Sequence, residues 1–197
     1  DSLPFIFAHV GGRYADIAMH DDEIEVAVEV HSAWGTFEWL VEEALDRGYR
    51  VGIVGNSDGH KCRPGSSYPG AGGFGSLGGL TCVLAESLDR DSLYRAIKAR
   101  RFYATTGNRP LLSVRVVASG GQEAVMGGSL SGTSLKLFAT VSGTAPLERL
   151  EVRNGTDDAV VLRPYTAEQL GPRVKVLWSG AEVKGRARMT RWDGRLE

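Results

Sequence analysis

Asp58 and His60 are the residues of this sequence best suited to hold a metal ion together. They follow the apolar run at 51–55, and two residues of extended chain place both side chains on the same side of a strand end. A carboxylate oxygen and an imidazole nitrogen are donors that divalent metals accept in one site. Gly59 lets the chain bend between them at little steric cost. The alternative interpretation is an ordinary Asp-Gly turn that leaves His60 exposed.

Metal-binding side chains also end two earlier apolar runs, and all four histidines of the chain lie in its first 60 residues. His9 follows one run, and Glu29 and His31 lie at the end of another. In strand geometry Glu29 and His31 share a face, so the two compete for one ligand role. His20 lies in the polar stretch Met-His-Asp-Asp, which indicates a solvated loop.

The elements that position these residues alternate between strand and helix patterns over residues 1–110. Thr36 and either Asp89 or Asp91 are suited to cap helices at their N-termini, and Gly48 is suited to end one. Parallel strands share one carboxyl edge, where α/β proteins place their active sites. The sequence therefore predicts an α/β part with its site at that edge. The predicted strands are 4–8, 24–30, 49–54 and 80–84, and the predicted helices are 37–47 and 92–101.

From residue 111 the pattern changes to short strands separated by glycine-rich turns. This spacing is typical of an antiparallel β-sandwich, and we expect residues 111–197 to form a β-sandwich accessory domain. The segment contains no histidine and no cysteine. Its predicted strands are 112–117, 134–141, 147–153, 159–162, 173–178 and 186–192.

The motif Ser-Asp-Gly-His at 57–60 resembles the last metal motif of the PHP (polymerase and histidinol phosphatase) family of metal-dependent phosphoesterases. His9 resembles the family's middle motif, a strand-end histidine followed by a small residue. The strand that ends at Glu29 and His31 resembles the acidic strand end between those motifs. The segment 100–107, Arg-Arg-Phe-Tyr-Ala-Thr-Thr-Gly, resembles a stretch that follows the PHP fold in a large bacterial subgroup, where a β-domain comes next.

The resemblance implies a partial PHP-type (β/α) barrel and a metal-dependent hydrolase with a small phosphoester or another phosphorylated molecule as substrate. Zinc, manganese or iron would suit mixed nitrogen and oxygen ligands, and a metal-bound water would supply the nucleophile. Arg13 and Arg63 flank two of the ligands and are candidates to hold the phosphate, although both are equally suited to a solvated surface. The implied metal ligands are His9, Asp58, His60, Glu29 and His31.

One departure from the family is the absence of its H-x-H pair, which is found nowhere in this sequence. We therefore expect the chain to be a fragment that lacks the first half of the barrel. A half barrel exposes a sheet edge, which invites pairing with a second copy or with the missing N-terminal half. The alternative function is a non-catalytic binding or structural module that keeps a barrel remnant.

Composition limits the remaining choices of partner. The formal net charge of −1 argues against nucleic-acid binding, which needs a basic face. No apolar run approaches the ~20 residues of a membrane span. Cys62 and Cys82 are either free thiols or a disulfide that closes the glycine-rich loop between them. Free thiols suit a cytoplasmic protein and a disulfide suits an exported one; a cytoplasmic location is slightly favoured, and export stays open.

Overall fold

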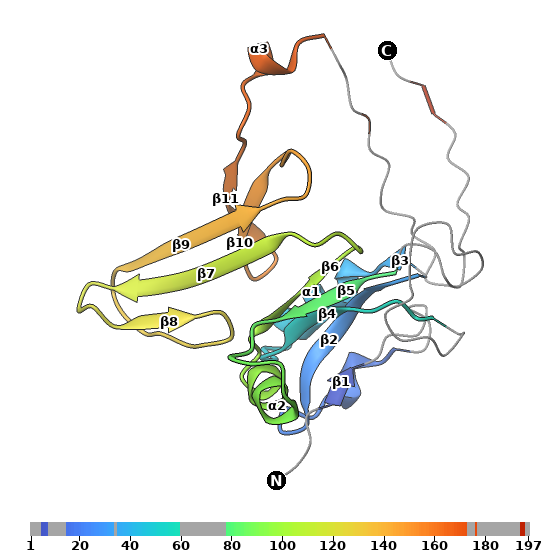
Figure 1. Cartoon of the computed structure of the whole chain (residues 1–197), viewed down its shortest axis with the longest axis vertical. Helices are drawn as coiled ribbons and strands as arrows, with labels where there is room; N and C mark the ends of the chain where they lie inside the picture. Colours follow the sequence, from blue (N-terminus) through green and yellow to red (C-terminus); the bar gives the residue numbers. More distant parts are fainter. Residues whose placement is uncertain are drawn as a thin grey trace.

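The computed structural model has a mainly parallel sheet near the start of the chain and antiparallel sheets near its end (Figure 1). The structure describes residues 5–7, 15–33, 35–59, 78–172, 176 and 194–195. The first elements are β1 (Phe5–Phe7), the 3-10 turn η1 (Ile17–Met19), β2 (Glu25–Ser32), β3 (Gly35–Thr36), α1 (Glu38–Asp46), β4 (Gly52–Gly55), β5 (Leu80–Val83), α2 (Arg90–Lys98) and β6 (Phe102–Thr105). They are followed by β7 (Leu111–Ala118), β8 (Glu123–Val125), β9 (Leu135–Ser142), β10 (Leu150–Asn154), β11 (Asp157–Leu162) and α3 (Ala167–Leu170).

The strand β2 is the centre of the first sheet. It pairs in parallel with β1, where Phe7 lies opposite Val28, and in parallel with β4, where Val28 lies opposite Ile53. The carboxyl ends of β1, β2 and β4 therefore point to the same edge, as the strand-and-helix alternation predicts. β3 adds a short antiparallel pairing at the end of β2. The strands of the described residues do not close into a barrel.

Both faces of β2 are buried over residues 26–30, which agrees with the three consecutive apolar residues at 26–28. On one face Val28 packs with Ile17, and with Leu40 and Ala44 of α1. On the other face Ala27 packs with Val54 of β4 and Phe102 of β6. The partly buried Val83 and Ile97 complete this second cluster, so β5, α2 and β6 are held to the parallel sheet by apolar contact.

The caps of the two longer helices agree only in part with the predicted capping residues. Asp89 caps α2, and its carboxylate accepts a hydrogen bond from the Ser92 amide at 2.8 Å, as predicted. Gly48, at φ 76°, follows the last turn of α1 as predicted. Thr36 does not cap α1, so that prediction is wrong. It belongs to β3, and the cap position falls to Phe37, which makes no side-chain cap hydrogen bond.

All strand pairings after residue 110 in the described residues are antiparallel, as expected. β7 lies between β8 and β9, and β10 pairs with β11 in a separate hairpin. The short strand β8 and the turn of helix α3 were not predicted. The predicted strands at 173–178 and 186–192 lie outside the continuously described residues, so the full sandwich stays a prediction.

One face of the β8-β7-β9 sheet is apolar throughout. Val116 lies opposite Leu137 on β9 and Ala124 on β8, and Val114 lies opposite Ala139. The other face is mixed, and there Arg115 lies over the Phe138 ring at 4.2 Å. No helix in the described part of the chain is long and apolar enough to cross a membrane.

Candidate functional site at the carboxyl edge of the parallel sheet

Glu29 is the best-defined member of the predicted site. It lies near the end of β2 and is only 7% exposed, so its carboxylate is removed from bulk water. The side-chain amide of Asn56, directly after β4, donates a hydrogen bond to this carboxylate. Because Asn56 and Asp58 are two residues apart, the contact brings the end of β2 next to the Asp-Gly turn.

His31 lies at the same edge but is held differently. Its Nδ1 atom lies 2.7 Å from the hydroxyl of Thr36 on β3, and its Nε2 atom is shielded from solvent. Its backbone carbonyl oxygen accepts a hydrogen bond from the backbone N–H of Asn56 at 3.0 Å. The pairing of β2 with β4 shifts register between Glu29 and His31, so the regular alternation assumed for these two residues is interrupted there.

Asp58 follows β4 in a left-handed backbone conformation, with φ at 50°. Aspartate tolerates this conformation better than most residues, yet it still carries a conformational cost. The side chain is half-buried, and the next amide, from Gly59, donates to the hydroxyl of Ser57 at 3.2 Å. A strained, half-buried aspartate at a strand end is a frequent feature of functional sites.

The backbone around Asn56 is fixed by two close approaches. A Cβ on Gly79 would lie 2.8 Å from the carbonyl carbon of Gly55, so only glycine allows these two chain segments to touch. The Thr81 hydroxyl accepts from the Gly55 amide at 3.1 Å and donates to the Gly55 carbonyl at 2.8 Å. The residues at the start of β5 thereby hold the end of β4 in place.

The remaining predicted site residues, His9, His60, Arg13 and Arg63, lie outside the described residues, as does Cys62. β1 runs parallel to β2, so the chain leaves β1 at the edge that carries Glu29. Within the described residues, no group of three or more His, Cys, Asp or Glu side chains is placed to hold a metal. The convergence of His9, Asp58 and His60 therefore stays a prediction.

His20 is not in a solvated environment, so the prediction of a solvated loop is wrong for its side chain. Its side chain is 0% exposed, and its Nδ1 and Nε2 atoms each lie 2.9 Å from a carboxylate oxygen, of Glu25 and Asp22 respectively. The ring also lies 4.6 Å from that of Tyr49. The run of acidic residues that follows His20 in the sequence, which includes Asp22 and Glu25, was the available signal for this cluster.

Comparisons with known proteins add relatives but no activity. No family model matches the sequence, and no solved structure matches it. The chain is 30% identical over 164 residues to an uncharacterised protein of Chlamydia muridarum, covering 68% of this chain and 25% of that protein. It is 29% identical over 171 residues to one of Chlamydia pneumoniae, with the same coverage, and 26% identical over 202 residues to one of Chlamydia trachomatis, covering 78% of this chain and 29% of the relative. The chain thus spans about a quarter of the length of the first two relatives.

Proposed function

We propose that this chain carries part of the active site of a metal-dependent phosphoesterase of the PHP type. The observation that carries the proposal is the Asn56–Glu29 hydrogen bond, which places a buried carboxylate beside the Ser57-Asp58 turn at the carboxyl edge of parallel strands. This edge is where α/β proteins place catalytic groups.

The donor set suits a divalent ion. Glu29 and Asp58 supply carboxylate oxygens, and His9, His60 or His31 would supply imidazole nitrogens, a mixture that zinc, manganese and iron accept. When bound, such an ion lowers the pKa of a coordinated water and offsets negative charge on a phosphoryl group. Asn56 would act as a positioning residue, because its amide fixes the orientation of the Glu29 carboxylate.

Binding of Mn²⁺ to residues 1–197, followed by electron paramagnetic resonance, tests this proposal. We expect Asp58→Asn and Glu29→Gln each to weaken binding about tenfold or more, because each removes a negative oxygen donor. Asp157→Asn, on exposed strand β11, removes the same charge far from the sheet edge and is the matched control. Equal Mn²⁺ affinity in all four proteins would refute the proposal and favour a non-catalytic module.

Turnover of a small aryl phosphate by the longer protein that contains this segment tests the chemistry separately from binding. The expected result is metal-dependent hydrolysis that Asp58→Asn abolishes. Metal binding without hydrolysis of any phosphoester would support the metal site and contradict the proposed reaction.

A further inference from the structure

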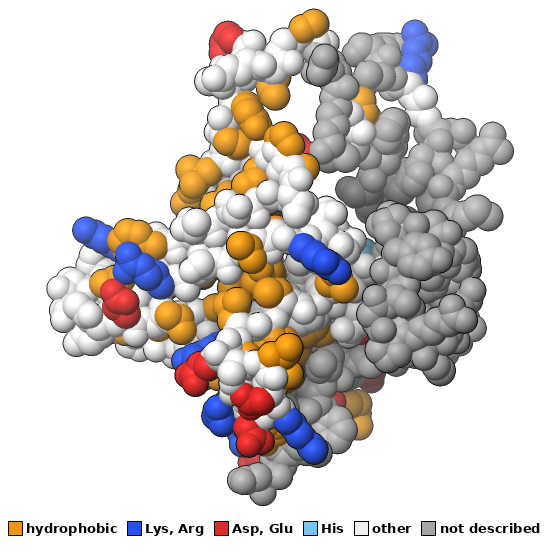
Figure 2. Space-filling model, viewed as in Figure 1, with side chains coloured by type: hydrophobic (Ala, Val, Ile, Leu, Met, Phe, Trp, Pro, Cys, Tyr) orange, Lys and Arg blue, Asp and Glu red, His pale blue; other side chains and the backbone are white. Residues whose placement is uncertain are grey.

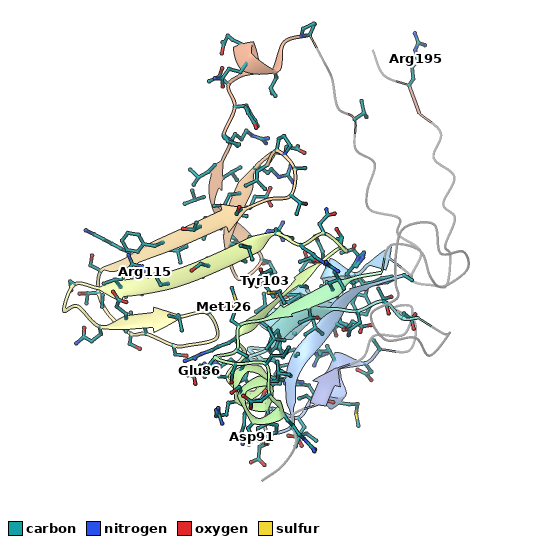
Figure 3. The ribbon with its side chains drawn as sticks, in the orientation of Figure 1. Glu86, Asp91, Tyr103, Arg115, Met126 and Arg195 are labelled. Atoms are coloured by element: carbon teal, nitrogen blue, oxygen red, sulfur yellow. The ribbon has the colours of Figure 1, made fainter. Side chains whose placement is uncertain are left out.

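A hollow of about 480 Å³ lies at the opposite end of β4 from the candidate metal site. It is bounded by the entry to β4, by Arg100 and the start of β6, and by the turn after β8. Figure 2 shows hydrophobic side chains gathered where the β7–β9 sheet meets the parallel sheet. In Figure 3, Tyr103 from β6 and Met126 from the turn after β8 lie at this junction. Volumes of roughly 300–1,000 Å³ are those of small-molecule sites.

Two arginines provide the charge in this hollow. Arg100 donates from Nε to the Arg50 carbonyl at 2.8 Å, and Arg50 donates from Nη2 to the Gly127 carbonyl at 2.7 Å. Neither guanidinium has a carboxylate within 4.0 Å among the described residues. Burial lowers the pKa of Arg100, and the nearby positive charge of Arg50 lowers it further, while Asp22 raises it. The site therefore holds two like charges that an anion would stabilise.

The backbone at Arg100 indicates that its side chain is kept at a cost. Arg100 follows the end of α2 with φ at 57°, the position and conformation that usually belong to glycine. A branched or long side chain there is conformationally unfavourable. The Arg100 side chain, which occupies this unfavourable position, lines the hollow.

A second hollow, of about 360 Å³, adjoins the first, because Met126, Gly127 and Gly128 line both. Its other walls are aliphatic, and four of them, Val114, Val116, Ala124 and Leu135, belong to the apolar face of the β8-β7-β9 sheet. Leu135 on this face is well exposed, since it is 47% accessible. An apolar surface of this kind, continuous with a cationic pocket, matches a ligand with an anionic head and an aliphatic body.

We propose that the two adjoining hollows form a binding site for a single-chain anionic amphiphile, with its phosphate or carboxylate head at Arg50 and Arg100 and its hydrocarbon chain along the apolar face of β7 and β8. The head is held by charge-assisted hydrogen bonds, and the chain is held by burial of apolar surface. The site is independent of the proposed metal centre, because it lies at the other end of the strands.

Calorimetric titration of residues 1–197 with monomeric decyl phosphate tests this site. We expect Arg100→Gly to weaken binding about tenfold or more, because it removes a charge-assisted donor. Glycine favours φ of 57°, so this variant relieves the backbone and retains the fold, which a thermal melt verifies. Arg101→Ala is the matched control, since it removes the neighbouring exposed charge outside both hollows. Equal losses in Arg100→Gly and Arg101→Ala would refute an arginine-specific head site.

Leu135→Gln and shorter ligands separate the head from the tail. Leu135→Gln is expected to weaken the binding of decyl phosphate several-fold, because the decyl chain reaches the apolar face. The much weaker binding of ethyl phosphate should be unchanged, because its short chain does not reach that face. Decanol is expected to bind less tightly than decyl phosphate. Absence of decyl phosphate binding would overturn the proposal. A dimeric mass by sedimentation would then assign the apolar face to a second copy of this chain.

Discussion

The Asn56 side chain donates a hydrogen bond to the Glu29 carboxylate and so joins the ends of two adjacent parallel strands. Glu29 is 7% exposed, so its carboxylate depends on such partners in place of water. The end of β2 and the turn after β4 are consequently held together, and replacing Asn56 is expected to disturb both.

Replacing Asn56 by alanine is expected to lower the free energy of unfolding by about 1–3 kcal/mol, because it removes a donor to a buried carboxylate. Urea denaturation measures the change. Asn154→Ala, at the exposed end of β10, removes the same amide group and should be nearly neutral. In the Glu29→Gln background the cost of Asn56→Ala should fall, since the acceptor is then uncharged, and an undiminished cost would contradict a direct coupling.

Thr81→Val is expected to destabilise the protein by about 1–3 kcal/mol at nearly constant side-chain volume, because it leaves buried polar groups unpaired. The Thr81 hydroxyl bonds both backbone groups of Gly55, and valine leaves both without that partner. Thr81→Ser keeps the hydroxyl and should retain most of the stability. If serine and valine are equally destabilising, the methyl group and not the hydroxyl holds β5 to β4.

The parallel sheet was predictable because local signals agree with the tertiary structure there. The apolar runs that end at Glu29 and before Asp58 form β2 and β4, and Gly48 and Asp89 have the helix-terminal roles that their chemistry favours. Thr36 does not cap α1 because it belongs to β3, where its hydroxyl makes a hydrogen bond with His31 of β2. Helix-capping preferences do not include this contact.

Other contacts were hidden from sequence reasoning because they join distant segments. Arg50 and Gly127 are 77 residues apart, and nothing in either local pattern indicates that they meet. Arg100 was assigned to a predicted helix, whereas its left-handed backbone ends that helix early. The buried environment of His20 likewise depends on Tyr49, which lies in the connection between α1 and β4.

The two carboxylates around His20 are expected to contribute unequally. The Glu25 side chain is 20% exposed and the Asp22 side chain is 67% exposed, although both lie 2.9 Å from the ring. Solvent screens the exposed contact more strongly, so Glu25→Gln should lower the thermal midpoint more than Asp22→Asn. A salt titration checks this order. The difference in thermal midpoint between the wild type and Asp22→Asn should shrink at lower ionic strength than the difference between the wild type and Glu25→Gln.

Acidification should remove the contribution of the Asp89 cap. Hydrogen bonds from the Ser87 hydroxyl, and then from Ser92, lower the pKa of Asp89 from 3.8 to about 2. A lowered folded-state pKa stabilises the protein above the unfolded value, and this stabilisation is lost as pH falls from 3.8 toward 2. The denaturation midpoint of the wild type should therefore exceed that of Asp89→Ala at pH 5, and the difference should narrow below pH 4.

Asp91→Asn is the matched control for this pH dependence, because it removes a carboxylate from the first turn of the same helix without removing the cap. Its difference from wild type should vary less between pH 5 and pH 2 than that of Asp89→Ala. A pH-independent difference for Asp89→Ala would contradict a role for the ionised cap.

Residues 1–197 alone are expected to hydrolyse an aryl phosphate slowly or not at all, even with added manganese or zinc. A catalytic zinc normally uses about three protein ligands, and the sequence lacks the H-x-H pair that the resembling family places on its first strand. The parallel sheet also ends at short strands whose edges favour pairing with a second copy or a further segment. Turnover with added metal is measured beside the solution mass. Robust hydrolysis by a purified monomer would show that the missing pair is dispensable and that the ligands at the carboxyl edge suffice.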